Sequence, residues 1–253
     1  MNRVWAVLLL TVVPVLARAD TGIAPRTLSA DIPTTGVATL ELKVGVGEVH
    51  ITASADDKVH AKVTLKQKEQ EFLWFFHWMS SGTSKEIATA TLEQKQQGDA
   101  LKLSLDYPGQ KNDDDGNVKQ EWEIQLPARL ALDAVMNVGE LTVAGVAGGV
   151  DAKLNVGELS IDVPRGALRG KVNVGEIRAK SGSAQHGDIR LSSNIGEALL
   201  SIAGQSSGVH DHGGLGNSVS VDGKGPDAME LSINIGEVSL HIDPKPDAKD
   251  GGK

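Results

Sequence analysis

The chain has 253 residues, no cysteine and a formal net charge of −8. Without cysteine it can form no disulfide framework, no thiolate metal site and no lipid-anchored cysteine. The excess of acidic residues argues against nucleic acid as a partner.

Residues 1–19 have the pattern of a secretory signal peptide. Arg3 precedes an apolar run from Val4 to Leu16, and Ala17-Arg18-Ala19 offers a small-x-small cleavage site. The apolar run is too short for a stable membrane span. We therefore expect an exported protein, placed first in the periplasm, with secretion or the cell surface as alternatives. Cleavage after Ala19 would remove two arginines and leave a net charge of 23 − 33 = −10.

Residues 20–131 are predicted to form an N-terminal β cap together with a first repeat. Segments such as "KVHAKVTL" and "ALKLSLDY" alternate apolar and polar residues, which is typical of strands with one face exposed to solvent. Terminal units of a repeat array need such a cap, because an open strand edge invites unwanted pairing.

An aromatic insertion at residues 72–79 interrupts this cap region. Its apolar members are Phe72, Leu73, Trp74, Phe75, Phe76, Trp78 and Met79. One interpretation is a hydrophobic plug that covers the open end of the core. The other is an exposed tip that contacts a membrane interface, a partner or a second copy. We treat the insertion as a candidate membrane or partner contact.

Residues 132–243 carry an internal repeat centred on a Gly-Glu pair. The predicted corner glycines are Gly47, Gly139, Gly157, Gly175, Gly196, Gly216 and Gly236. The steps after Gly139 are 18, 18, 21 and 40 residues, and the last step, twice twenty, suggests a weakened copy at Gly216. Self-similarity at a period near twenty residues is typical of stacked repeat architectures.

Apolar residues alternate before each glycine and resume two residues after it. The residue directly before the glycine, as in Val138, Val156 and Val174, is predicted to point inward with this set. The phase of the alternation then slips by one residue, which glycine tolerates at a bulge or corner. Each copy is thus read as strand, corner, strand and turn. The sequence predicts an all-β fold, a parallel β-solenoid with about 18–21 residues per coil.

Two stretches, "GELTVAGVAGGVDAKLNVGELSIDV" and "GDIRLSSNIGEALLSI", resemble a known family. They are similar to the bacterial putative-adhesin β-solenoid domains of unknown function, close to the toast-rack solenoids of envelope-stress proteins. The resemblance covers roughly Leu28 to Asp243 and implies a solenoid fold. It implies adhesion only through the family's name.

Two polar columns would line the outside of such a stack. Asn137, Asn155, Asn173, Asn194 and Asn234 stand two residues before the glycine, where stacked amides can bond to one another. The candidate acidic stripe is Glu140, Glu158, Glu176, Glu197 and Glu237, directly after the glycine, with Glu48 in the first copy. Each glutamate has either a local partner, such as Lys153, Lys171 or Arg178, or a place in a stripe that binds a cation or cationic peptide.

A weaker metal-like signal lies at His210 and His212, with Glu230 expected beside His210 on the next coil. Zinc needs three or four ligands, so we interpret the histidines as a solvated pair and predict no metal and no cofactor. Residues 244–253, rich in Pro, Gly and charge, are predicted to be a disordered tail.

Three functions remain open from the residues. The first is a non-enzymatic cell-envelope binding or scaffold protein whose partner is an envelope protein, a peptide or a membrane surface. The second is a periplasmic sensor that captures cationic peptides on the glutamate stripe. The third is a polysaccharide-active β-helix enzyme with a charged cluster, for which Asp151, Lys153, Arg169, Lys171 and Arg190 are the available residues. Those residues fit a mixed-charge strand face better, so we predict no enzyme and no catalytic residue.

Overall fold

The computed structural model describes residues 24–67, 83–108, 118–182, 186–203, 209–212, 217–221 and 229–243. Within these ranges the chain is almost entirely β-structure, and its strands join a single sheet. The N-terminal elements are β1 (Arg26–Pro33), β2 (Thr39–Ser54), β3 (Lys58–Gln67), α1 (Thr83–Thr89), β4 (Thr91–Gln97), β5 (Ala100–Asp106) and β6 (Val118–Pro127). The later ones are β7 (Ala131–Ala144), β8 (Val150–Val163), β9 (Gly166–Ser181), β10 (His186–Ala203), β11 (Val209–His212), β12 (Asn217–Val221) and β13 (Met229–Asp243).

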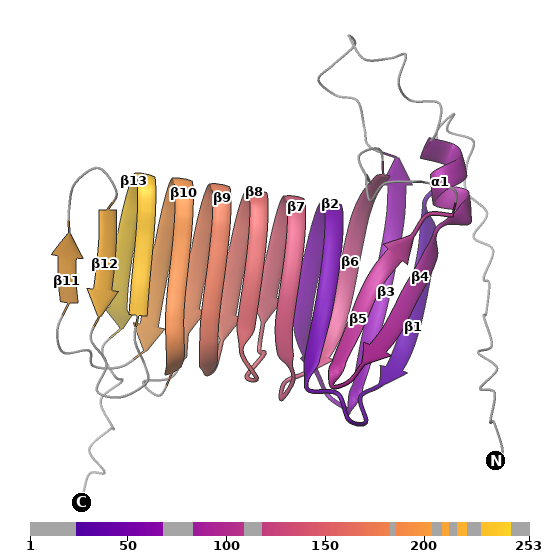
Figure 1. Ribbon diagram of the computed structural model, residues 1–253, viewed down its shortest axis with the longest axis horizontal. Coiled ribbons are helices and arrows are strands. Elements are labelled where there is room, and N and C mark those ends of the chain that lie inside the picture. Colours follow the sequence, from indigo (N-terminus) through magenta and orange to yellow (C-terminus); the bar gives the residue numbers. More distant parts are fainter. Residues whose placement is uncertain are drawn as a thin grey trace, which may run out of the picture.

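The middle of the sheet is a parallel stack of the long strands β2, β7, β8, β9, β10 and β13 (Figure 1). Their register is the one that the repeat predicts, since the corner glycines pair in the order Gly47, Gly139, Gly157, Gly175, Gly196, Gly236. Both ends of the sheet contain antiparallel pairs. The fold is therefore an open, mixed sheet, and the prediction of a purely parallel one is corrected.

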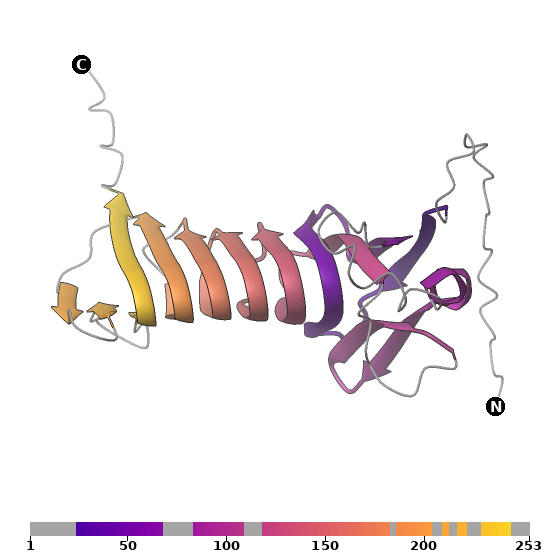
Figure 2. The same cartoon turned by 90° about the horizontal axis from the view of Figure 1, so that it is seen from above.

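The long strands curve over one edge of the stack, so their first and second halves form two facing layers (Figures 1 and 2). Leu132, Ala134 and Met136 from the first half of β7 are buried, as are Leu141 and Val143 from its second half. The same spacing recurs in the neighbouring strands, so the core between the layers consists of stacked aliphatic side chains. Burial of this apolar surface is the main force that holds such layers together.

The residue before the corner glycine points outward in five of the copies, which corrects the inward prediction. Val138 is 36%, Val156 39%, Val174 38%, Ile195 48% and Ile235 63% exposed. The strand bends here, so the asparagine and the aliphatic residue both lie on the outside of the bend. Met136, the last inward residue before the bend of β7, and Leu141, the first inward residue after it, are five positions apart. Because five is an odd number, the alternation of inward and outward residues is reversed across the bend.

At its N-terminal end the stack opens into two wings, which Figure 2 shows diverging. The first half of β2 pairs with β5, which pairs with β4. The second half of β2 pairs with β6, followed by β3 and β1. Trp122 of β6 is fully buried between the wings and donates its indole N–H to Oε1 of Gln120 at 2.9 Å.

At the C-terminal end, a short antiparallel hairpin replaces the expected seventh copy. β10 pairs directly with β13, so the step of 40 residues is not two coils. Residues 217–221 run antiparallel to the first half of β13, and β11 pairs with them in turn. Gly216 itself lies outside the described residues. A repeat spacing alone cannot distinguish a weakened coil from a hairpin of equal length.

Candidate functional site

The outer edge of the bend is built on a column of glycines. Gly139, Gly157 and Gly175 have φ between 136° and 137°, a backbone conformation that residues with a side chain rarely adopt. A Cβ atom on Gly157 would overlap the backbone carbonyl oxygen of Gly139, and the same overlap recurs from one copy to the next. The glycines thus let neighbouring bends approach closely, and this fixes the outward columns in exact register.

The asparagine column forms the predicted amide ladder. Asn155 donates its side-chain N–H to Oδ1 of Asn137 at 3.2 Å, and Asn173 donates to Oδ1 of Asn155 at 3.1 Å. Asn194 donates to Oδ1 of Asn173 in the same way. Each of these bonds uses one N–H and one lone pair, so Asn137, Asn155 and Asn173 keep further donors and acceptors for another molecule.

The glutamate column is in register, as predicted, and several of its members have local partners. Arg178 pairs with Glu158 and places its Nη2 2.6 Å from Oε1 of Glu176. Thr142 donates its hydroxyl to Oε1 of Glu140 at 3.4 Å. Arg178 is therefore the predicted local partner that the structure places beside the glutamate column. Lys153 instead pairs with Asp151, at 3.3 Å, on the layer formed by the first halves of the strands.

The first glutamate of the column, Glu48, pairs with a lysine from the wing. Nζ of Lys119 lies 2.7 Å from its Oε1. This hydrogen bond is the main cause that lowers the pKa of Glu48 below its usual value. The acidic column is thus partly neutralised at its N-terminal end by Lys119 and in its middle by Arg178.

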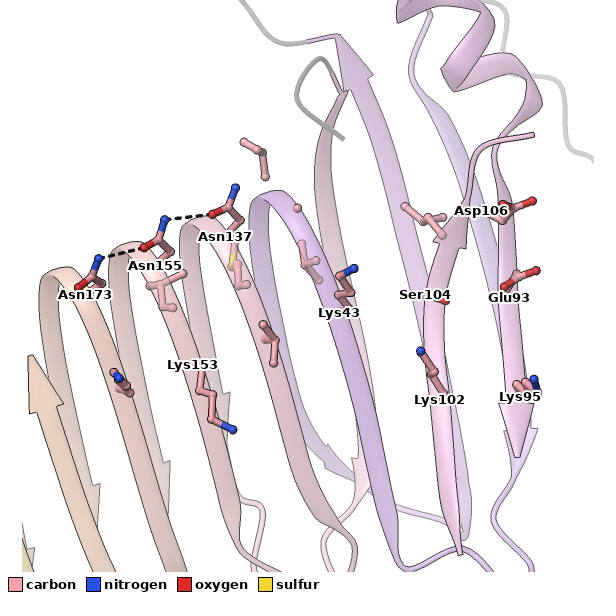
Figure 3. Close-up of a pocket in the computed structure, with 18 residues that line it drawn as sticks. Lys43, Glu93, Lys95, Lys102, Ser104, Asp106, Asn137, Lys153, Asn155 and Asn173 are labelled. Carbon is pink, nitrogen blue, oxygen red and sulfur yellow. Dashed lines mark hydrogen bonds between the residues drawn. The ribbon is translucent and has the colours of Figure 1, made fainter. Parts of the chain in front are cut away.

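A groove opens on the first-half layer, where β5 leaves β2 (Figure 3). The two strands pair only from Thr39–Leu42 to Ala100–Leu103 and then diverge. The groove has a volume of about 860 Å³, which lies in the range of small-molecule sites. The amides of Asn137, Asn155 and Asn173 line its upper edge in Figure 3.

Lysines dominate the charge of this groove. Its charged lining residues are Lys43, Lys95, Lys102, Lys153, Lys171, Glu93 and Asp106, which sum to 5 − 2 = +3. Lys95 and Lys102 stand directly opposite one another across β4 and β5. Lys153 and Lys171 are register neighbours on β8 and β9. Like charges so placed repel, in a chain whose overall charge is negative.

Sequence reasoning did not single out this groove. Lys43, Lys153 and Lys171 recur four residues before the corner glycine, a signal that the repeat alignment contains. Lys95 and Lys102 come from β4 and β5, which have no repeat motif. Only the pairing of β5 with β2, in which Lys102 aligns with Glu41, brings Lys102 and its cross-strand neighbour Lys95 to the groove.

The remaining predicted positions have different outcomes. The aromatic residues 72–79 lie outside the described residues, so their role stays a prediction. His210 aligns with Ser220, and Ser220 with Glu230, so one strand separates His210 from Glu230, contrary to the expected adjacency. Asp151 aligns with Arg169, and Arg169 with Arg190, in a row of mixed charge as the sequence predicts. Among the described residues, no helix is long and apolar enough to cross a membrane.

No family model and no curated protein matches the chain. Among solved structures it is similar to a putative cell adhesion protein from Clostridium sporogenes, with 15% identity, 88% of this chain and 100% of that chain covered, and a TM-score of 0.47. A putative adhesin from Bacteroides fragilis is 14% identical, with 86% and 97% covered and a TM-score of 0.31. A putative lipid binding protein from Parabacteroides distasonis is 11% identical, with 87% and 96% covered and a TM-score of 0.25.

The sequence resemblance to putative adhesins is confirmed in the names of the first two of these structures. The assignment of function rests on the residues of this chain.

Proposed function

We propose that this chain is a non-enzymatic, exported binding or scaffold protein of the cell envelope, built on a β-solenoid. The observation that carries the proposal is the in-register glycine column. It stacks the bent strands so closely that identical residues form straight outward rows of asparagine, aliphatic residues and glutamate. Long, rigid and repeated surfaces of this kind are typical of repeat proteins that bind extended partners.

The aromatic insertion is the proposed contact with a membrane or an envelope partner. Gln67 ends β3 and Thr83 begins α1, so the insertion joins two elements at the N-terminal end of the stack (Figure 1). Described residues already fill the core at this end, among them Trp122, Leu65 and Ile87. This supports a role for Phe72 to Met79 outside the core. The alternative, a hydrophobic plug, predicts that the fold needs them.

Flotation with liposomes of envelope lipids tests this proposal. The protein is compared with a variant in which residues 72–79 are replaced by a Gly-Ser linker, and circular dichroism reports whether both are folded. We expect only the parent to float. If both remain folded and neither floats, the membrane contact is wrong. If the variant unfolds, the insertion is a core plug. Fractionation of the expressing cell tests export separately, and retention in the cytoplasm would contradict it.

A second candidate function is capture of cationic peptides on the glutamate stripe. The observation that favours it is the exposed aliphatic column of Val138, Val156, Val174, Ile195 and Ile235, which runs directly beside the stripe. A cationic amphipathic peptide could use both columns. Against it, Lys119 and Arg178 already neutralise part of the stripe. Peptide binding that resists Glu197→Gln and Glu237→Gln would exclude this function.

A further inference from the structure

We propose that the lysine-lined groove binds a segment of an acidic glycan, an inference that rests on the proposed envelope binding function and assigns it a ligand. The groove is the concave region between the β4–β5 wing and the first halves of β2, β7, β8 and β9. It differs from the glutamate stripe, which lies beyond the bend on the second halves of the same strands.

The positive charge of the groove favours binding of an anion. Among the described residues, Lys95, Lys102 and Lys171 form no ion pair, although Lys95 and Lys102 are cross-strand neighbours. Asp151 pairs with Lys153, and Glu41 aligns with Lys102 on β5, although neither carboxylate lines the groove. The formal charge of the lining residues is 5 − 2 = +3. A ligand with several carboxylates would relieve the repulsion between these lysines.

The amide ladder favours a ligand that carries hydroxyl groups beside its carboxylates. Asn137, Asn155 and Asn173 line one edge of the groove, and their remaining N–H groups and lone pairs are arranged in a row. A hydroxyl both donates and accepts, so it can bond to an amide that offers both functions. Sugars present such hydroxyls on every residue, whereas an acidic peptide offers mainly backbone amides and carboxylates.

The repeat of the groove suits a linear polymer. Equivalent residues on neighbouring strands are spaced about 4.8 Å apart. Asparagines therefore recur at that interval, and Lys153 and Lys171 follow the same step. A linear chain of uronate-type sugars carries one carboxylate and several hydroxyls per unit and can extend along the row. Lys102, which lines the groove from β5, would contact the polymer beside this row.

The test measures binding of the purified protein to polygalacturonate by isothermal titration calorimetry at low and high salt. The fully methyl-esterified polymer is a matched neutral probe, and polyglutamate is a matched carboxylate probe without sugars. Lys102→Gln with Lys171→Gln removes two groove lysines. Lys58→Gln with Lys180→Gln is the control, because it removes the same charge from exposed sites outside the groove, and Lys180 lies on the same strand as Lys171.

We expect polygalacturonate to bind, and to bind more weakly at high salt. The groove variant should bind about tenfold more weakly, and the control should be unchanged. Equal effects of the two variants, or no binding at all, would overturn the groove assignment and leave the envelope function standing. Equal affinity for polyglutamate would overturn the choice of a glycan, and equal affinity for the neutral polymer would overturn the role of charge. A cytoplasmic location would contradict the envelope function whatever the binding result.

Discussion

At the residue scale, the corner glycine decides how closely two strands can stack at the bend. Gly157 is held at φ 137° with the carbonyl oxygen of Gly139 in the place that a side chain would occupy. An alanine must therefore both adopt a strained backbone and push the neighbouring coil away. Glu158, which follows this glycine, faces outward and is reached by solvent. Its replacement should therefore disturb the fold less than replacement of Gly157.

Gly157→Ala should lower the free energy of unfolding by at least ~3 kcal/mol, from backbone strain and overlap together. Gly98→Ala is the control, because Gly98 also has positive φ, +64°, but its Cβ would meet no atom within 4 Å. That variant should lose only about 1 kcal/mol. Urea unfolding followed by circular dichroism measures both. Equal losses would mean that strain, and not the close approach of the coils, explains the glycine column.

At the scale of elements, a histidine links the edge strand β1 to β3 and the turn before β3. Nδ1 of His60 lies 2.7 Å from Oδ1 of Asp31, and its Nε2 lies 3.0 Å from Oδ1 of Asp56. Two carboxylate partners favour the form of the ring that donates from both nitrogens. The hydrogen bond with Asp31, followed by that with Asp56, therefore raises the pKa of His60.

A raised pKa in the folded state makes stability depend on pH. The stabilising contribution of His60 is complete below its unfolded pKa, near 6.5, and is lost as the pH rises through the higher folded pKa. Between pH 5.5 and pH 8, with Asp31 and Asp56 ionised, the protein should lose stability on alkalinisation. Urea unfolding at both pH values checks this. His60→Gln and Asp31→Asn should each reduce the difference between them, and an undiminished difference would show that other groups cause it.

At the scale of the whole molecule, the parallel stack is a quasi-one-dimensional array. The step from Gly139 to Gly157 equals the step from Gly157 to Gly175, 18 residues each. In such an array each long strand contacts mainly its two neighbours, so stability is roughly a sum of strand and interface contributions. Removal of one whole period should therefore join equivalent positions and preserve the register.

Deletion of residues 146–163 should leave a folded β-protein with a lower unfolding midpoint, because one coil and one interface are lost. Deletion of residues 146–154, half a period, should prevent folding, since it places outward residues in the core. Circular dichroism and size-exclusion chromatography distinguish the two. A whole-period variant that fails to fold would mean that β8 makes contacts beyond its neighbours.

The Gly-Glu repeat was sufficient to predict the long strands, their register from Gly47 to Gly196 and the identity of the columns. These follow from a local rule, the recurrence of Gly-Glu with apolar residues at fixed offsets, and each coil repeats the environment of the last. The outward orientation of Val138 and its equivalents became visible in the three-dimensional fold, because the bend places two consecutive residues on its outer side. The pairing of distant segments also places β11 and β12 as an antiparallel pair beside β13, and brings Lys102 into one groove with the lysines of the stack. The physical reason is that these outcomes depend on pairing between segments without a common motif, for which local periodicity carries no information.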